Sequence, residues 1–352
     1  MSIITLQGEK ERAKGIYYEV DTANNPIGIG GMGRVYRGLC INRTTRESKP
    51  VAVKFIFEDS PISSIERARR EASIQLRNDN LIEMLGFIET QNKAGNGNVV
   101  SHYHVVSELL HGVTLLDVLD GKDVDYAGKK VPFATEMYQM YNSQRERFAL
   151  IIVKSVLSGL MALHDNGYIH RDIDPSNIML TADEHVKLID FGIAKRLDML
   201  TAESDVLSDP CQKERLVGKM SYAAPELVKS DVTHQDKTTD IYAVGILLFQ
   251  LLSGHLPFEG TMQDVMEMQL NSDVPLNDIS NPNLRNIIKK ATDKQQGNRF
   301  QSTSEFRVAL DKCPIGQRKR SASSHFPIPF PYVMAGITLV GLGMGIALAL
   351  IL

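Results

Sequence analysis

Two aspartates and one asparagine in the middle of the chain are candidates for metal-dependent chemistry. Asp172, Asn177 and Asp190 fall within nineteen residues, at turns flanked by strand-like runs. Carboxylate and carboxamide oxygens are ligands that Mg²⁺ prefers when it accompanies phosphates. Any one of these residues alone would favour a simple turn, but their grouping suits Mg²⁺ on a nucleotide.

A glycine-rich segment near the N-terminus is a candidate for phosphate binding. Gly28, Gly30 and Gly33 form a G-x-G-x-x-G pattern. Because glycine has no Cβ, backbone N–H groups can approach phosphate oxygens closely. A dinucleotide-binding turn would require a helix directly afterwards, whereas residues 34–37 read as a strand. The glycines are therefore expected to join two strands.

One lysine follows the glycines at the distance of a hairpin. Lys54 ends the run V-A-V-K at 51–54, whose other residues are apolar. A lone lysine at the end of a strand is usually solvated. Its position after the glycine segment favours a second interpretation, in which the ammonium reaches phosphate groups.

The order of these motifs resembles the protein-kinase family, in particular bacterial serine/threonine kinases of the eukaryotic type. The series is G-x-G-x-x-G-x-V at 28–35, V-A-V-K at 51–54, H-R-D-x-x-x-x-N at 170–177, D-F-G at 190–192 and A-P-E at 224–226. The resemblance covers about residues 16–312. It implies an α+β fold with a β-rich first lobe and an α-rich second lobe, and transfer of the ATP γ-phosphate to protein serine or threonine.

The resemblance assigns a role to each motif position. Asp172 would accept the substrate hydroxyl proton, Lys54 would hold the α- and β-phosphates, and Asn177 and Asp190 would bind Mg²⁺. Other residues expected around the ATP are Gly28, Gly30, Gly31, Gly33, Val35, Ala52, Glu108, Leu110 and Met179.

Three supporting contacts are also implied by the family pattern. Glu226 is expected to pair with Arg299, and Asp240 is expected to anchor the catalytic loop from a buried helix. The partner of Lys54 is expected to be Glu71, with Glu66 as the alternative. A further alternative is that Glu71 only pairs with Arg67 on the helix surface, since these residues are four apart.

Asp174 departs from the family pattern. Serine/threonine kinases usually carry lysine at this position, where its charge neutralises the transferring phosphate. Lys219 stands where the family usually has threonine, beside the catalytic loop. The hypothesis is that Lys219 pairs with Asp174 and supplies the missing charge. The alternatives are a solvated Lys219 and a nucleotide-binding pseudokinase that acts as a membrane-tethered scaffold.

The elements that must position these residues change character along the chain. Residues 50–57 read as a strand, and Ser63 with Glu66 predicts a capping box for a helix reaching about Arg77. From about residue 145 the pattern is mainly helical. The expected domain spans 16–312, with lobes at 16–110 and 111–312 after an N-terminal tail of 1–15.

Composition excludes several classes of protein. The 352 residues carry 39 basic and 42 acidic side chains, so a dedicated nucleic-acid binder is not expected. Three cysteines without a C-x-x-C pair argue against a disulfide framework or structural zinc. The partners expected are protein substrates and a membrane.

The membrane prediction comes from residues 333–352, which contain no charged side chain. A helix of this length would be about 30 Å long, which matches the core of a bilayer. The basic run at 317–320, within a linker at 313–332, places the kinase on the cytoplasmic side, with a bacterial inner membrane suspected. Gly341 and Gly345 are compatible with a homodimer.

Regulation is expected to involve the segment between D-F-G and A-P-E. Arg171 precedes Asp172, an arrangement associated in the family with phosphorylation of this segment. Autophosphorylation is therefore expected at one of its hydroxyl residues, among them Thr201, Ser204, Ser208 and Ser221.

Overall fold

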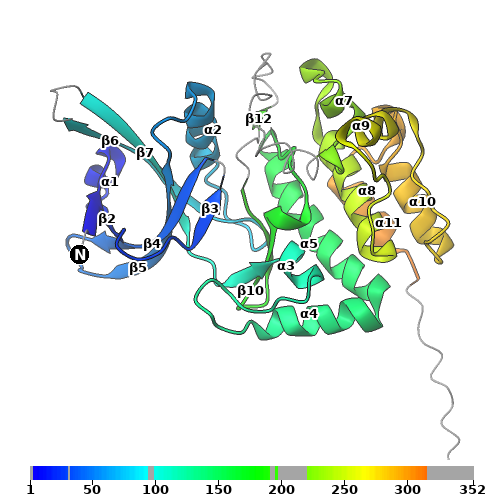
Figure 1. Ribbon diagram of the computed structural model, residues 1–352, viewed down its shortest axis with the longest axis horizontal. Coiled ribbons are helices and arrows are strands. Elements are labelled where there is room, and N and C mark those ends of the chain that lie inside the picture. The colour runs from blue at the N-terminus through cyan, green and yellow to red at the C-terminus, as the bar shows by residue number, and fades with distance from the viewer. Residues whose placement is uncertain (1–2, 31, 94–98, 191–194, 197–219, 315–352) are drawn as a thin grey trace, which may run out of the picture. The chain divides into compact units, whose positions relative to one another are not determined.

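The computed structural model describes residues 3–30, 32–93, 99–190, 195–196 and 220–314. One compact unit spans Met1–Cys313. It consists of a β-rich lobe followed by a helical lobe, as the sequence predicted (Figure 1).

The first lobe is built on a curled antiparallel sheet with the strand order β1-β2-β4-β5-β7-β6, and β3 pairs with β4 (Figure 1). Its strands are β1 (Ile3–Leu6), β2 (Ile16–Asp21), β3 (Gly28–Gly30), β4 (Gly33–Asn42), β5 (Ser48–Ile56), β6 (Met84–Lys93) and β7 (Val99–Glu108). Val51 and Val53 of β5 belong to a hydrophobic cluster on one face. Because side chains alternate along a strand, Lys54 faces the opposite side.

The segment expected to be an N-terminal tail contributes to this sheet. Strand β1 pairs with β2 along Ile3–Leu6 and is followed by α1 (Glu9–Ala13). Leu6 is only 1% exposed and lies in the same cluster as Tyr18, Val20 and Val53. Leu6 therefore anchors the N-terminal segment on the sheet.

Helix α2 (Ile62–Ser73) begins and ends differently from the prediction. The capping-box prediction is wrong: the N-cap residue is Pro61 and no side chain caps the helix, which ends before Arg77. Ser63 lies inside the first turn, because the helix begins at Ile62, directly after Pro61. Ala68, Glu71 and Ala72 are buried at helical spacing and define the inward face.

The second lobe is organised around two buried helices. Its helices are α3 (Leu115–Leu119), α4 (Pro132–Ser143), α5 (Arg145–Asp165), α7 (Pro225–Val228), α8 (Lys237–Ser253), α9 (Met262–Asn271), α10 (Pro282–Ala291) and α11 (Thr303–Asp311). Helix α8 is buried on nearly every side. It starts at an Asp236 cap and stops at Gly254, whose φ of 91° is left-handed and favours glycine.

Short strands complete the second lobe and frame its catalytic segments. Strands β8 (Gly112–Thr114), β10 (Ile178–Thr181) and β11 (Val186–Leu188) form one small sheet, and β9 (Tyr168–Ile169) pairs with β12 (Lys195–Arg196). Strand β9 leads into the H-R-D motif, and β11 leads into Asp190.

Helix α5 is the one helix of the described residues that is long and apolar enough to cross a membrane. It contains ten buried residues and packs against α8 in the core, so its apolar character has a structural explanation. The predicted transmembrane helix at 333–352 lies outside the described residues.

Candidate active site

The glycine-rich hairpin joins β3 and β4, as predicted, with Gly28 opposite Val35 and Gly30 opposite Gly33. A Cβ on Gly33 would lie 2.1 Å from the carbonyl oxygen of Phe55, so this glycine is required by the close approach of β4 to β5. A Cβ on Gly28 or Gly30 would make only ordinary contacts. Packing therefore does not require glycine at positions 28 and 30. Close approach of a ligand is the remaining explanation for these two glycines. Gly31 lies outside the described residues.

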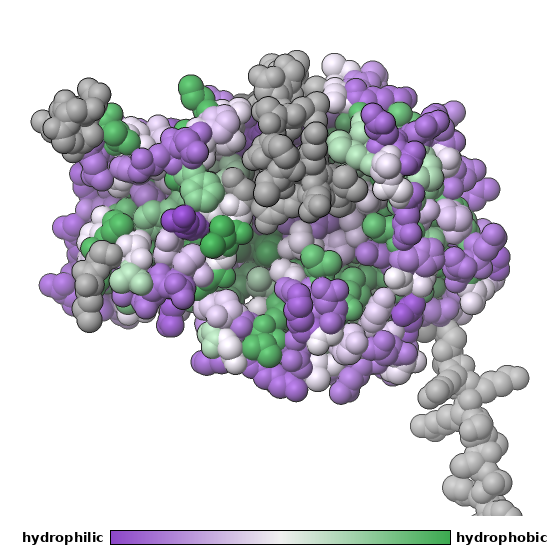
Figure 2. Space-filling view, in the orientation of Figure 1, coloured by the Kyte–Doolittle hydropathy of each residue, from purple (hydrophilic) through white to green (hydrophobic). Residues whose placement is uncertain are grey.

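The predicted nucleotide residues of the first lobe share the inner face of its sheet. Val35 pairs with Lys54 across β4 and β5, and Ala52 lies two residues before Lys54 on the same side. Met179 comes from β10 in the second lobe. In Figure 2, hydrophobic side chains gather beside the hollow between the two lobes.

Lys54 lies in the electrostatic field of two carboxylates from different lobes. Burial disfavours its ammonium form, but Asp190 and then Glu71 outweigh that effect, so the pKa of Lys54 is raised above its ordinary value. Asp190 has a left-handed φ of 59°, a conformation that aspartate tolerates better than most residues. The structure thus brings together the predicted phosphate-binding lysine and a predicted metal ligand.

Glu71 is 5% exposed and directed inward, whereas Glu66 is exposed. Its Oε2 has no hydrogen-bond partner within the described part of the chain. Burial, opposed by Lys54 and reinforced by Asp190, raises the pKa of Glu71 to about 7. The geometry favours Glu71 over Glu66 as the carboxylate that acts on Lys54.

This raised pKa predicts a pH-dependent stability. Between about pH 4.5 and pH 7 the folded chain holds a proton at Glu71 that the unfolded chain releases, so stability falls as pH rises through that window. Glu71→Gln is expected to flatten the fall, measured by urea denaturation across pH 4–8. Glu66→Gln on the exposed side of α2 is the control. An unchanged slope in Glu71→Gln would contradict the assignment.

The catalytic loop is anchored by Asp240, as expected from the family pattern. This carboxylate is completely buried and accepts hydrogen bonds from the main-chain N–H of His170 at 2.8 Å and of Arg171 at 2.7 Å. It also contacts Nε2 of His164 at 2.8 Å. Burial opposes ionisation, but the histidine contact and the Arg171 N–H outweigh it and lower the pKa of Asp240. The charge therefore persists at neutral pH and fixes the loop.

Asp174 has a structural role that the sequence comparison did not predict. It caps the 3₁₀ turn Pro175–Asn177, accepting from the Ser176 N–H at 2.6 Å and from the Ser176 hydroxyl. Nδ2 of Asn177 donates to the carbonyl oxygen of Asp172 at 2.8 Å and lies 3.4 Å from Asp174. The amide nitrogen is thereby turned toward the loop, so Oδ1 of Asn177 faces the other way. Lys219 lies outside the described residues.

The segment that follows the end of β7 and connects the two lobes, here called the hinge, contains an ion pair that the sequence did not predict. Glu108 ends β7, and its Oε1 accepts from Nζ of Lys187 at 2.7 Å and from the Glu83 N–H at 2.8 Å. Lys187 belongs to β11, three residues before Asp190, so the pair joins the hinge to the strand that leads to the candidate metal ligand. No sequence signal links these residues, which are 79 positions apart. Leu110, the other residue expected beside the adenine, lies two positions after Glu108. Glu108 and Leu110 are both partly buried.

The segment ending in A-P-E is held by a buried ion pair. Arg299 is 1% exposed and donates from Nη1 and Nη2 to the two carboxylate oxygens of Glu226, at 2.8 and 3.0 Å. The prediction of this pair is confirmed. It fixes α7 to the segment between residues 296–298 and α11.

A second buried network holds the main chain just before A-P-E. Gln269 of α9 is fully buried, and its Nε2 donates to the carbonyl oxygens of Ser221 at 2.6 Å and Met220 at 3.3 Å. Its Oε1 accepts from the Tyr242 hydroxyl at 2.5 Å, which accepts in turn from Lys294 at 2.8 Å. Each group fixes the orientation of the next.

For a chain that phosphorylates proteins, as the family resemblance implies, this network predicts a role in the binding of the acceptor protein. Loss of the two hydrogen bonds that Gln269 donates, each worth about 1 kcal/mol, is expected to raise the KM for an acceptor protein about thirtyfold. Gln269→Leu would be assayed with dephosphorylated casein, and its KM for ATP is expected to stay within about twofold. Gln263→Leu, exposed on the same helix, is the control. Equal effects on both KM values would contradict the prediction.

The first lobe is a curled β-sheet that carries the glycine hairpin and Lys54, and the second lobe is helical and carries the loop anchored by Asp240. Together these features define a protein-kinase catalytic domain. A family model described as "Protein kinase domain" matches residues 22–308, so the chain belongs to the protein kinase family.

Curated relatives agree with this family. The chain is 30% identical over 291 residues to the Probable serine/threonine-protein kinase PknB of Lactococcus lactis, covering 80% of this chain and 40% of the relative. It is 32% identical over 254 residues to Serine/threonine-protein kinase PknL of Mycobacterium tuberculosis, covering 71% of this chain and 53% of the relative. The matched regions thus span about half or less of these relatives' lengths.

Proposed function

We propose that this chain is a serine/threonine protein kinase that transfers the γ-phosphate of ATP to hydroxyl groups of proteins. The observation that supports it most is that Lys54 lies in the electrostatic field of the carboxylates of Asp190 and Glu71. The names of the bacterial relatives support serine and threonine as acceptors. The segment D-P-S-N at 174–177 also resembles the serine/threonine type of catalytic loop.

The donor set fits ATP with Mg²⁺. Oδ1 of Asn177 and the carboxylate of Asp190 would hold the metal, and Lys54 would hold the α- and β-phosphates. When bound, the metal would neutralise charge that develops on the transferring phosphate. Asp172 would accept the hydroxyl proton of the substrate, and Asp240 keeps its loop in place.

Asp174 and Lys219 form the least conventional part of the proposal. Asp174 orders Asn177 as a turn cap, and Lys219 would supply the cation that the family usually places at position 174. Lys219→Ala is expected to lower phosphoryl transfer by orders of magnitude while nucleotide binding changes little. Near-normal turnover would remove Lys219 from the mechanism.

Membrane attachment belongs to the same proposal. Residues 333–352 would form a single membrane-spanning helix behind the linker at 313–332, with the kinase domain at 16–312 on the cytoplasmic side. Pairing of such helices would favour autophosphorylation of one chain by another. Deletion of 333–352 is expected to move the protein into the soluble fraction after cell lysis.

The decisive test is incorporation of radiolabel from [γ-³²P]ATP and Mg²⁺ by the full chain, with and without casein. Labelled phosphoserine or phosphothreonine is the expected product, and Asp190→Asn is the control that should remove it. ATP binding without any incorporation would support the pseudokinase alternative instead.

A further inference from the structure

The chain after α10 places Lys294 against side chains of α8 and α9 in the helical lobe (Figure 1). The Lys294 ammonium donates to the Tyr242 hydroxyl at 2.8 Å and to the carbonyl oxygen of Met268 at 3.4 Å. The same nitrogen lies 5.0 Å from the centroid of the Phe258 ring and 5.3 Å from that of the Tyr242 ring. Two aromatic rings and two oxygens thus surround a partly buried positive charge.

This ammonium sets the direction of a buried chain of hydrogen bonds. A lysine ammonium can only donate, so the Tyr242 oxygen accepts from it and the Tyr242 O–H donates to Oε1 of Gln269 at 2.5 Å. Nε2 of Gln269 then faces the carbonyl oxygens of Ser221 and Met220, which can only accept. Tyr242 and Gln269 are completely buried. The groups at the two ends therefore fix the orientation of both side chains between them.

A neutral amine at position 294 would remove this directionality. Its lone pair can accept from the Tyr242 O–H, which would then point away from Gln269. Oε1 of Gln269 would be buried without a donor, and an unsatisfied buried acceptor is costly. The hold of Gln269 on the main chain of Ser221 and Met220 therefore depends on the charge of Lys294.

The carbonyl end of this chain lies close to the catalytic loop. The Met220 carbonyl oxygen also accepts from the Ala223 N–H at 3.1 Å, which closes a turn that contains Tyr222. Burial, and then the charge of Asp174, raises the pKa of Tyr222, so this turn and the catalytic loop are near each other. Asp174 lies two residues after Asp172, the candidate proton acceptor. A protein that brings a hydroxyl to Asp172 is therefore expected to contact the turn.

Lys294 loses its charge within an accessible pH range. Burial lowers the pKa of Lys294 to about 8. Asp273 after α9 and the neighbouring Asp293 oppose this shift, whereas the Arg299 guanidinium adds to it. Aspartate and arginine side chains ordinarily titrate far from pH 8. Burial raises the pKa of Tyr242, so its hydroxyl stays protonated. Among these groups, Lys294 is the one that changes charge near pH 8.

We propose that Lys294 is a positioning residue for acceptor proteins, whose charged form, acting through Tyr242 and Gln269, holds the turn before A-P-E in place. The inference rests on the proposed kinase function, since it assigns that turn to the binding of acceptor proteins. It follows that the affinity for an acceptor protein falls as the pH rises through about 8, while the affinity for nucleotide does not.

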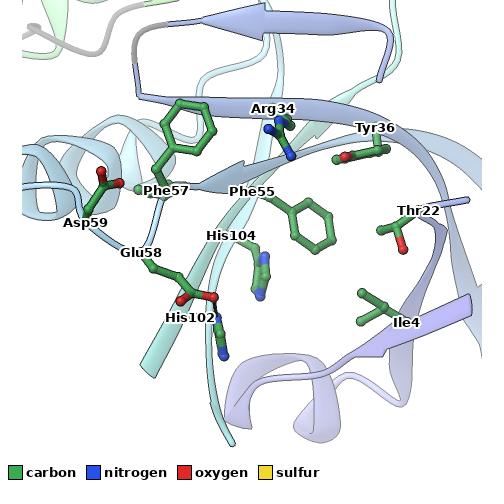
Figure 3. Close-up of a pocket in the computed structure, with 11 residues that line it drawn as sticks. Ile4, Thr22, Arg34, Tyr36, Phe55, Phe57, Glu58, Asp59, His102 and His104 are labelled. Atoms are coloured by element: carbon green, nitrogen blue, oxygen red, sulfur yellow. Dashed lines mark ion pairs between the residues drawn. The ribbon is translucent and has the colours of Figure 1, made fainter. Parts of the chain in front are cut away.

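Other titratable groups act at a different pH or at a different place. His104 lines a depression on the outer face of the first lobe's sheet (Figure 3), where burial lowers its pKa to about 4, so it stays neutral above pH 7. Glu71, whose pKa burial raises to about 7, belongs to the candidate nucleotide site. Burial raises the pKa of the Cys40 and Cys313 thiols. A change near pH 8 that disappears when Lys294 is replaced therefore belongs to Lys294.

The test measures the Kd of fluorescently labelled, dephosphorylated casein for the full chain by anisotropy, with saturating ADP and Mg²⁺. Between about pH 7 and about pH 9.5 the wild-type Kd is expected to rise about fivefold, which corresponds to the loss of one hydrogen bond. Lys294→Arg keeps the charge, so its Kd should stay constant. Lys294→Met should show the higher Kd at every pH. The Kd for ADP, measured by calorimetry, should be the same in all three proteins.

Tyr242→Phe separates the hydrogen-bond chain from the packing around Lys294. It keeps both rings but removes the hydroxyl, so casein should bind weakly and without a change near pH 8. Lys289→Met, at an exposed lysine of α10, is the control and should behave like the wild type. A rise in Kd that persists in Lys294→Arg or Tyr242→Phe, or no binding of casein at pH 7, would overturn the proposal. Binding of casein that weakens near pH 8 as expected, without any phosphate transfer, would support the role of Lys294 and contradict the kinase activity.

Discussion

Replacing Asp172 by asparagine is expected to lower the rate of phosphoryl transfer by about 10²–10⁴-fold, the range typical for loss of a general base. Asp172 is 8% exposed and sits in a loop whose main chain is fixed by Asp240 at His170 and Arg171. Asparagine has the same shape but cannot accept a proton, so the loop should keep its structure. The measurement is kcat for casein phosphorylation, together with the Kd for ATP, which should change little.

The matched control is Asp174→Asn, two residues along the same loop. Asparagine caps a turn about as well as aspartate, so Ser176 and Asn177 should stay in place. Asp174→Asn is expected to lower the rate of phosphoryl transfer much less than Asp172→Asn does. Comparable losses in both variants would show that the assay reports the charge of the loop rather than a proton acceptor at position 172.

Breaking the buried pair between Arg299 and Glu226 is expected to have the largest effect on stability. Arg299→Met leaves the Glu226 carboxylate, 6% exposed, without its bidentate partner. Removal of one member of such a pair typically costs 3–5 kcal/mol of unfolding free energy, because the remaining charge stays buried. Since the chain has no tryptophan, urea denaturation would be followed by circular dichroism.

The double variant Arg299→Met/Glu226→Met separates the charge from the packing. It removes both ions, so it is expected to be more stable than Arg299→Met alone. Thr239 and Gln296 also donate to Glu226, at 2.8 and 3.2 Å, and lose an acceptor in the double variant. A single variant within about 1 kcal/mol of the wild type would show that Glu226 finds another partner or water.

Much of the fold was predictable because its motifs have a fixed order and local geometry. The glycine hairpin, Lys54 on a central strand and Asp240 on a buried helix follow from short stretches of sequence whose neighbours are mostly apolar. The confirmed pair of Glu226 and Arg299 was predictable only through the family pattern, since nothing local joins positions 73 residues apart.

The contacts that escaped prediction are those between elements distant in the sequence. Lys187 reads as a polar residue in a short strand, and its pairing with Glu108 depends on how β11 meets the hinge. Gln269 reads as an ordinary residue of an amphipathic helix, yet tertiary packing buries it against Ser221. Side-chain periodicity carries no information about such partners. The start of α2 was mispredicted because a proline replaced the side-chain cap.

Because strand β1 is part of the sheet, the folded catalytic domain begins before the start of the family match. The family match starts at residue 22, but Leu6 already covers Tyr18 and Val20, and β2 hydrogen-bonds to β1 along its outer edge. A shortened protein that begins at the family border would lack β2 and would uncover Val51 and Val53. Expression vectors for biochemical work should therefore keep the chain from Met1. Any affinity tag should be placed before Met1 and separated from it by a flexible spacer.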